Sequence, residues 1–305
     1  MVLFAILMYA LMGLAFPFGK WALQCTTMLS PAYVIAFRMI PAGLGFIIYH
    51  FWTQKLANRF RWSDLWFLFI IGLTGVYLHL VLEYWSLKYL DTVKANFIYS
   101  LSPFITAFLS YFLISERLSG KQWKALLIGF VGMVPIILSK NVGEFGLASF
   151  AAFSLPELAM LFSTIALDYS WFSFRTLSAR GHSLHLINGA GMLIGGFLSA
   201  GHFLFFHGFQ LFPVHAPINF LWLSLVLVLV SNITTYNIYS YLLKKYSVTF
   251  LSFAGFILPI FGALYGKLIY GESITWHYGV ALFFIALGLW LFHKGSVEKG
   301  ERAHL

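Results

Sequence analysis

The sequence predicts an all-α integral membrane protein with ten transmembrane helices, arranged as two inverted repeats of five helices. Composition is the first reason: 60% of the 305 residues are hydrophobic and 10% are charged, whereas an ordinary soluble domain is about 25% charged. The second reason is a series of ten apolar runs, and the third is an internal repeat between the two halves of the chain. A chain with so few charged residues cannot give itself a water-soluble surface.

The apolar runs have the length that a membrane requires, because about 20 helical residues cross a hydrocarbon core about 30 Å thick. We expect the first run to be a retained helix, since no positively charged segment precedes it. The ten runs are residues 2–22, 31–52, 64–87, 93–114, 121–139, 154–175, 184–207, 217–243, 247–269 and 274–293.

The basic residues between these runs predict the orientation of the chain. If the N-terminus is cytoplasmic, the segments on that side hold most of the 19 lysines and arginines: Lys55, Arg59, Arg61, Arg117, Lys121, Lys124, Arg175, Arg180, Lys244, Lys245, Lys294, Lys299 and Arg302. The positive-inside rule therefore favours cytoplasmic termini. Because the charges are scattered rather than gathered in one patch, the net charge of +9 does not indicate nucleic-acid binding.

The internal repeat appears when residues 79–132 are shifted forward by 156 positions. Pro103 then aligns with Pro259, Glu116 with Glu272, and Gly132 with Gly288. Each copy contains five spans, an odd number, so the second copy must be inverted in the membrane relative to the first. Inverted repeats of this kind place a substrate site at their interface and alternate its access by rocking one half against the other.

The chain resembles the ten-helix EamA branch of the drug/metabolite transporter superfamily. The residues that carry the resemblance are GLAFPFGKWAL in the first span, IAFRMIPAG in the second, LSPF and ISERLSGKQW in the fourth and fifth, and LPIF and YGESIT in their second-half counterparts. The resemblance implies a secondary carrier with a central cavity. It also implies two repeats, residues 1–140 and 154–293, followed by a cytoplasmic tail at 294–305.

Four charged residues stand out because they lie well inside the predicted spans: Lys20, Arg38, Glu83 and Asp168. Each costs at least about 2.5–3.5 kcal/mol at the centre of a membrane helix, so we treat them as candidate substrate-binding residues. Alternatively, Arg38 and Glu83 form a buried ion pair, and Lys20 extends toward the headgroups. An unpaired Asp168 carboxylate would bind a proton or a cationic group of the substrate.

Proton coupling has a further candidate in His79, one helical turn before Glu83 on the same face. A histidine buried with satisfied hydrogen bonds is the alternative. Glu83 and Asp168 complete the set of proton-coupling candidates. We expect no metal site, because neither the histidines nor the single cysteine show metal-ligand spacing.

Aromatic residues make up 20% of the chain, and most of them are expected to face lipid. Among those on helices that line the cavity in the resembling family, Tyr99, Trp171 and Tyr236 are candidates for substrate contact, together with Asn232. A proline within a span kinks the helix, so Pro17, Pro103 and Pro259 are candidate hinges. Gly191 and Gly195 have the four-residue spacing that allows helices to approach closely.

These features predict a secondary transporter in a bacterial inner membrane, acting as a monomer or a homodimer among membrane lipids and without a cofactor. No phosphate-binding loop is present in the sequence, which argues against ATP hydrolysis. Two positive and two negative groups within the spans favour a zwitterionic substrate, such as an amino acid or S-adenosylmethionine. Exchange of one substrate molecule for another is one mode of transport that fits. A lipophilic drug exporter is the alternative, while a membrane-embedded enzyme or an assembly subunit fits the sequence less well. Direction of transport and coupling ion stay open.

Overall fold

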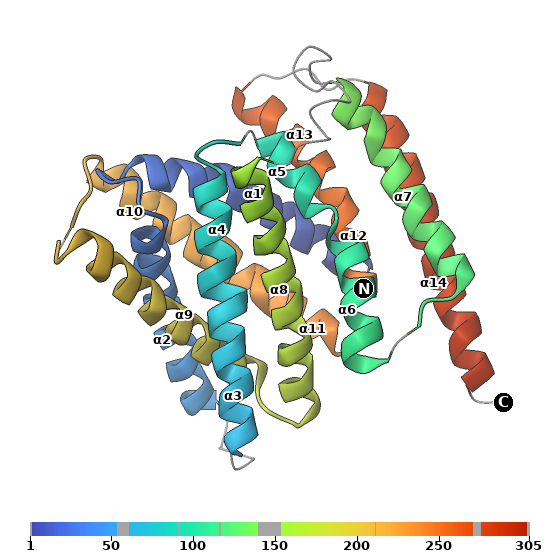
Figure 1. Ribbon diagram of the computed structural model, residues 1–305, viewed down its shortest axis with the longest axis horizontal. Coiled ribbons are helices and arrows are strands. Elements are labelled where there is room, and N and C mark those ends of the chain that lie inside the picture. Colours follow the sequence, from blue (N-terminus) through green and yellow to red (C-terminus); the bar gives the residue numbers. More distant parts are fainter. Residues whose placement is uncertain are drawn as a thin grey trace.

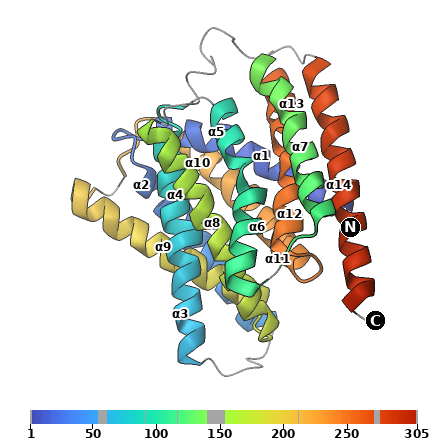
Figure 2. The same cartoon turned by 45° about the vertical axis from the view of Figure 1, so that its right-hand side comes forward.

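The computed structural model describes residues 2–53, 61–90, 92–115, 117–139, 154–210, 212–270 and 276–303. Within these ranges the chain is helical apart from turns and one isolated antiparallel bridge, between Thr26 and Val214. The helices form one bundle, shown in Figures 1 and 2.

Helical stretches cover all five predicted runs of the first half. They are α1 (Val2–Gln24), α2 (Pro31–Thr53), α3 (Trp62–Ile70), the π-helical segment η1 (Ile71–Leu78), α4 (His79–Ser86), α5 (Thr92–Tyr99), α6 (Ser102–Ile114) and α7 (Gly120–Ser139).

The second half has the same order of elements. They are α8 (Leu155–Ala179), α9 (Leu184–His207), α10 (Pro217–Val226), the π-helical segment η3 (Leu227–Thr235), α11 (Tyr236–Leu243), α12 (Val248–Ala254), the 3₁₀ turn η4 (Gly255–Ile257), α13 (Leu258–Tyr270) and α14 (Trp276–Ala303).

The helix boundaries repeat with the spacing of the sequence repeat. The segments η3, α12 and α13 each start 156 positions after their counterparts η1, α5 and α6. Even the departures from regular α-helix therefore recur in the second half.

Two of the predicted spans are interrupted rather than continuous. The span predicted at 93–114 is split into α5 and α6, and Pro103 lies in the first turn of α6. The span predicted at 247–269 is split by η4, and α13 then begins at Leu258, directly before Pro259. Proline has no backbone N–H and is tolerated best in a first helical turn, which explains both positions. Pro17, in contrast, lies inside the continuous helix α1.

The π-helical segments were not predicted from the sequence. In η3 the hydroxyls of Thr234 and Thr235 donate to the carbonyls of Leu229 and Val230, five residues earlier, at 2.8 and 2.9 Å. In η1 the hydroxyl of Thr74 donates to the carbonyl of Ile70 at 2.8 Å. Side-chain hydroxyls that bind backbone carbonyls compete with the helical hydrogen bonds. Such widened turns are frequent at functional sites.

Glycines permit close packing between the halves. A Cβ atom on Gly191 would lie 2.7 Å from Cγ2 of Ile71, and one on Gly195 would lie 2.7 Å from the carbonyl oxygen of Gly72. The close approach predicted from the spacing of these two glycines is confirmed, with α9 packed on η1. The helices α7 and α14 also run side by side, as both views of the bundle show.

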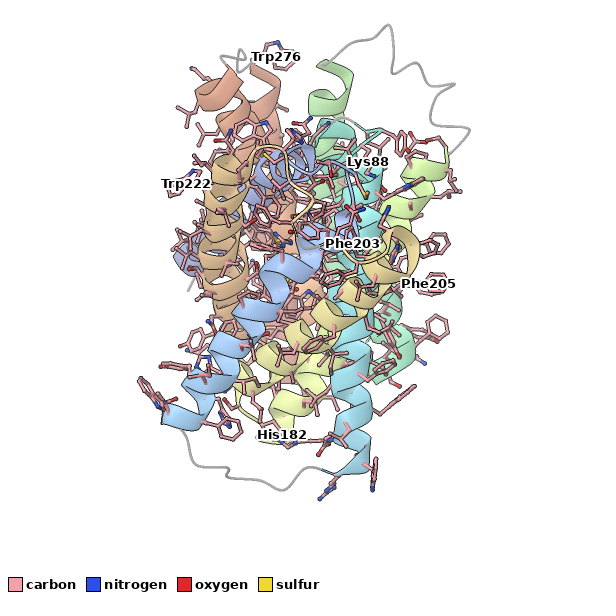
Figure 3. The ribbon with its side chains drawn as sticks, turned by 90° about the vertical axis from the view of Figure 1, so that its left-hand side faces the viewer. Lys88, His182, Phe203, Phe205, Trp222 and Trp276 are labelled. Carbon is pink, nitrogen blue, oxygen red and sulfur yellow. The ribbon has the colours of Figure 1, made fainter. Side chains whose placement is uncertain are left out.

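The fold is that of an integral membrane protein. Within the described residues, five stretches are long and apolar enough to cross a membrane: Ile6–Gln24, Pro31–Thr53, Trp62–Ser86, Leu184–His207 and Pro217–Leu243. Three shorter apolar helices accompany them: Ser102–Ile114, Val248–Gly262 and Gly279–Phe292. Large side chains such as Phe205 and Trp222 point outward (Figure 3) and are 84% and 63% exposed. An apolar surface of this kind suits a lipid surrounding.

The last helix extends beyond the apolar run that ends at residue 293. Helix α14 continues to Ala303, into the segment predicted to be the tail. No proline occurs between Trp276 and Ala303, so nothing in the sequence stops the helix where the apolar run ends.

The packing of α9 on η1 generates the first prediction. Replacement of Gly195 by alanine should lower the melting temperature in detergent, because a Cβ there meets the backbone of Gly72, and overpacking typically costs about 1–3 kcal/mol. Gly201→Ala is the matched control on the same helix, since a Cβ there meets nothing within 4 Å. Equal melting temperatures for the two variants would contradict the close packing.

Candidate functional site

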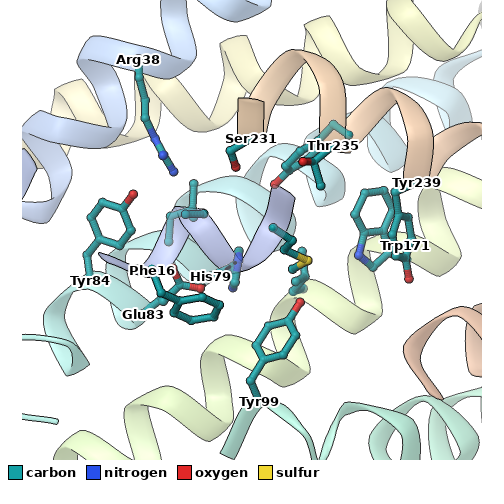
Figure 4. Close-up of a pocket in the computed structure, with 15 residues that line it drawn as sticks. Phe16, Arg38, His79, Glu83, Tyr84, Tyr99, Trp171, Ser231, Thr235 and Tyr239 are labelled. Carbon is teal, nitrogen blue, oxygen red and sulfur yellow. Dashed lines mark ion pairs between the residues drawn. The ribbon is translucent and has the colours of Figure 1, made fainter. Parts of the chain in front are cut away.

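A cavity lies at the centre of the bundle, between elements of both halves (Figure 4). It leaves about 50 Å³ for water-sized molecules, room for a few waters. The side chains that line it come from α1, α2, α4, α5, α8, η3 and α11: Met12, Ala15, Phe16, Arg38, His79, Leu80, Glu83, Tyr84, Tyr99, Leu167, Trp171, Ser231, Thr235, Tyr236 and Tyr239.

The lining is built from equivalent positions of the sequence repeat. His79, Leu80 and Glu83 line it from the first half, and the residues 156 positions later, Thr235, Tyr236 and Tyr239, line it from the second half. Met12 and Phe16 likewise correspond, at a shift of 155, to Leu167 and Trp171. The cavity therefore lies where the two repeats face each other.

One side of the cavity is charged. Arg38 of α2 is 2% exposed, and its guanidinium carbon lies 5.2 Å from the centre of the Tyr84 ring. The Arg38 atoms Nε and Nη1 have no hydrogen-bond partner among the described residues. A buried guanidinium without hydrogen bonds is costly, so this one is suited to receive an anionic group of a ligand.

The direct ion pair between Arg38 and Glu83, one of the two alternatives from the sequence, is not formed. The Glu83 carboxylate instead faces His79, with 3.5 Å between Oε2 and Nε2. The positions of the residues on α4 explain this pairing. His79 and Glu83 are four residues apart and share one face of the helix. Arg38 contacts the ring of Tyr84, which follows Glu83 and lies on the adjoining face. Both charged groups nevertheless line the same cavity.

His79 lies at the cavity wall, with Ser163 at one ring nitrogen and Glu83 at the other. Its Nδ1 is 2.9 Å from the hydroxyl oxygen of Ser163 on α8. The same hydroxyl lies 2.9 Å from the backbone carbonyl oxygen of His79. The histidine therefore joins α4 to α8 and also contacts the carboxylate of Glu83. Both alternatives from the sequence therefore fit His79: it is hydrogen-bonded within the core, and it lies beside Glu83 at the cavity, where a proton-coupling residue is expected.

The opposite side of the cavity is aromatic. The rings of Trp171 and Tyr239 are stacked, with centroids 4.0 Å apart and planes 29° apart. Tyr236 lies at 5.6 Å from Trp171. Figure 4 shows Trp171 and Tyr239 across the cavity from Arg38 and Glu83. A ligand that spans the cavity would thus meet charge at one end and flat rings at the other.

Three of the candidate substrate-binding residues do not line the cavity. Lys20 donates to the carbonyl of Leu90 at 3.5 Å. The amide of Asn232 contacts the sulfur of Met39 at 2.9 Å. Asp168, 3% exposed, accepts a hydrogen bond of 2.8 Å from Ser102 on α6 through Oδ1, and its Oδ2 has no partner among the described residues. Asp168 faces α6 because Leu167 and Trp171 occupy the cavity face of α8.

Five other candidates do line it: Arg38, Glu83, Tyr99, Trp171 and Tyr236. Sequence reasoning missed Ser231, Thr235 and Tyr239, which contribute hydroxyl groups to the lining. Their four-residue spacing within one predicted span, the pattern of a single helix face, was the available signal. It was obscured by the many other polar and aromatic residues of that span.

Contacts between loops and helix ends join the two halves of the chain at both ends of the bundle. At one end the buried Asp64 of α3 binds Arg180, and its Oδ2 lies 3.1 Å from Nε2 of His182. At the other end of α2 and α9, the backbone N–H of Thr27 donates to the carbonyl of Pro213 at 2.9 Å. Figure 3 places His182 and Trp276 at opposite ends of the molecule. Asp64 was not singled out from the sequence because it lies at a helix end, where a carboxylate is ordinary.

A multi-pass helical membrane protein with a buried polar cavity between repeated halves has the architecture of a membrane transport protein. The model of the EamA-like transporter family matches residues 1–138 and again residues 154–293, and the chain belongs to this family. The resemblance inferred from the sequence motifs is confirmed. The chain is therefore a transporter by class and not an enzyme.

Several chlamydial relatives are named S-adenosylmethionine/S-adenosylhomocysteine transporter. The protein from Chlamydia muridarum is 32% identical over 279 residues, which cover 89% of this chain and 85% of the relative. The protein from Chlamydia trachomatis serovar L2 is 31% identical over 294 residues, covering 94% and 86%. An uncharacterised transporter from Archaeoglobus fulgidus is 23% identical, with 92% and 93% coverage.

A solved crystal structure has the same fold. Its TM-score with this chain is 0.69 at 19% sequence identity, and the match covers 95% of both chains. At this sequence identity the similarity shows that the helices are arranged alike, and it carries no information about function.

The lining generates the second prediction. In a Cys25→Ser background, Thr235→Cys should react with a small charged thiol reagent, because Thr235 lines the cavity and alternating access would open that cavity to water. Ile233→Cys, two residues away and 38% exposed on the outer surface, is the control and should react more slowly, because thiols need to ionise to react and hydrocarbon prevents this. Faster labelling of Ile233→Cys would place the water-accessible face of η3 elsewhere.

Proposed function

We propose that this protein carries S-adenosylmethionine and S-adenosylhomocysteine across the inner membrane of a bacterium by alternating access. The observation that carries the proposal is the two-sided cavity, charged at Arg38 and Glu83 and aromatic at Trp171 and Tyr239. The names of the chlamydial relatives support the same substrates.

The chemistry of the substrates suits the two sides. Both molecules have an amino-acid end with a carboxylate and an ammonium group, and an adenosine end with a flat base. The guanidinium of Arg38 matches a carboxylate, and Glu83 offers a carboxylate to the ammonium group. Trp171, Tyr236 and Tyr239 offer faces for the adenine, since aromatic side chains stack on bases at about 1–3 kcal/mol per base. A lipophilic drug without an anionic group would leave the buried guanidinium of Arg38 without a partner.

Transport requires the two halves to move. We assign residues 1–140 and 154–293 to inverted five-helix repeats and residues 294–305 to a cytoplasmic end. The recurrence of η1, α5 and α6 at a shift of 156 supports this assignment. A nucleoside conjugate needs more room than a few waters, so the contacts at Asp64 and at Thr27 would open in turn. The helix interruptions at Pro103 and Pro259, and the proline in α1, Pro17, are the proposed hinges.

We propose that one chain is sufficient for this cycle, because described residues from both halves of the chain already surround the cavity. A monomer therefore suffices, and a homodimer would hold two independent sites. Membrane lipid surrounds the bundle in either case. No cofactor is required, because concentration gradients drive the movement.

The proposed orientation gives the third prediction. In a Cys25→Ser background in intact cells, a membrane-impermeant thiol reagent should label Tyr89→Cys but not Trp62→Cys. The two positions are 63% and 88% exposed. Trp62 lies two residues before Asp64 at the end that we assign to the cytoplasm, and Lys88, next to Tyr89, lies at the end away from His182 in Figure 3. The reverse labelling pattern would overturn the proposed topology.

The proposed substrate gives the fourth prediction. Proteoliposomes that hold only this protein and unlabelled S-adenosylmethionine should take up labelled S-adenosylmethionine by counterflow. Its carboxyl ester should compete at least about tenfold less well, because truncating one partner of a buried charge pair costs roughly 2–5 kcal/mol. Arg38→Gln should abolish this preference for the free carboxylate.

Lys245→Gln is the control for the loss of a positive charge, because Lys245 is exposed and lies over the ring of Tyr241. Competition by the ester equal to that of the free acid would refute the role of Arg38. Counterflow with lipophilic drugs in place of S-adenosylmethionine would favour the drug exporter instead.

A further inference from the structure

The contacts of His79 fix where its protons are. Ser163 has one hydroxyl proton and lies 2.9 Å from two groups of His79, the backbone carbonyl oxygen and Nδ1. A carbonyl oxygen only accepts. Both contacts are hydrogen bonds only if Ser163 donates to the carbonyl and accepts from an Nδ1–H group. The neutral ring of His79 then has no proton on Nε2.

That bare nitrogen faces a carboxylate. Nε2 of His79 lies 3.5 Å from Oε2 of Glu83, and both side chains are buried, at 5% and 7% exposure. Two acceptors that face each other in a buried site repel unless a proton lies between them. The pair therefore has one binding place for a proton, on Glu83 or on His79, and it is neutral when that place is filled.

Other groups with charge or ionisable hydroxyls face the pair from the elements around α4. They are Arg38 on α2, Tyr84 on α4 itself, Tyr99 on α5, and Tyr236 and Tyr239 on α11. The lining residues of α1 are apolar, and Asp168 of α8 lies outside the lining, bonded to Ser102. Arg38 thus supplies a fixed positive charge, and the His79–Glu83 pair supplies a negative charge that a proton can cancel.

The two proposed substrates differ by one charge. S-adenosylmethionine has a sulfonium and a net charge of about +1 at neutral pH, whereas S-adenosylhomocysteine is a neutral zwitterion with an uncharged thioether. With the first substrate and an empty proton site, the charges of Arg38, Glu83 and substrate sum to +1. With the second substrate and a filled proton site they also sum to +1. A buried site disfavours any change in its total charge.

We propose that the His79–Glu83 pair exchanges a proton for the sulfonium charge, so that S-adenosylmethionine moves one way while S-adenosylhomocysteine and one proton move the other way. This inference rests on the proposed function. S-adenosylmethionine enters with Glu83 ionised and leaves on the far side. S-adenosylhomocysteine then binds there, and a proton from the same side occupies the pair. Both are released on the first side, so each turnover moves no net charge across the membrane.

The test uses proteoliposomes loaded with S-adenosylhomocysteine and supplied outside with labelled S-adenosylmethionine. An entrapped pH-sensitive dye should report one proton leaving the lumen for each S-adenosylmethionine taken up. An acid-inside gradient of one pH unit should raise the final accumulation of S-adenosylmethionine about tenfold, because a tenfold ratio corresponds to about 1.4 kcal/mol. A potential of about 60 mV, which an electrogenic exchange would convert into the same tenfold ratio, should have no effect.

Exchange of labelled for unlabelled S-adenosylmethionine is the internal control, since it should move no net protons. If this exchange proceeds but the exchange against S-adenosylhomocysteine follows the potential and moves no protons, the proton inference is wrong and the proposed function stands. If neither exchange occurs, the proposed function fails and this inference fails with it.

Glu83→Gln tests the residue itself. The amide cannot ionise, so S-adenosylmethionine exchange should fall at least tenfold more than exchange of S-adenosylhomocysteine for itself, and remaining exchange should move no protons. Glu157→Gln is the matched control, because Glu157 caps α8 by accepting from the N–H of Ser154 at 2.6 Å, as an amide oxygen also does. Continued proton movement in Glu83→Gln at the wild-type stoichiometry would overturn the assignment.

Discussion

The absence of water in the hydrocarbon core governs the rest of this structure. Backbone groups there must find partners within the chain, which leaves helices as the available form. The same constraint makes each buried ionisable side chain costly. Arg38 and Glu83 are therefore kept only where they face a cavity, and His79 is held by a serine of the neighbouring helix α8.

The sequence repeat explains why the cavity has two sides. Equivalent positions of the two halves, such as Glu83 and Tyr239, face one cavity. They have diverged in chemistry, so that one copy supplies a carboxylate and the other a ring. Equivalent positions of the sequence repeat thus enclose a site whose two sides differ in chemistry. An elongated ligand with unlike ends fits such a site in one orientation, whereas a symmetric lining would not distinguish its ends.

The contacts at the two ends of the bundle also differ in chemistry. The two ends of α2 and α9 are held by contacts of different kinds, a buried carboxylate with two basic groups near Asp64 and backbone hydrogen bonds near Thr27. The packing against glycines such as Gly72 and Gly195 keeps the helices between these ends close together. The two halves are therefore joined by contacts at both ends of these helices and by glycine packing along their length.

Sequence alone determined the helices, the internal repeat, the family and most of the cavity candidates. Apolar run length and the alignment of Pro103 with Pro259 are properties of the chain, and they do not depend on how the helices pack. Only the tertiary structure decided which polar groups meet. Arg38 lies over Tyr84 instead of pairing with Glu83, and Asp168 turns toward Ser102 and away from the cavity. The direction in which a side chain points depends on the rotation of its helix within the bundle, and the π-helical turns and the glycine contacts between the halves set that rotation.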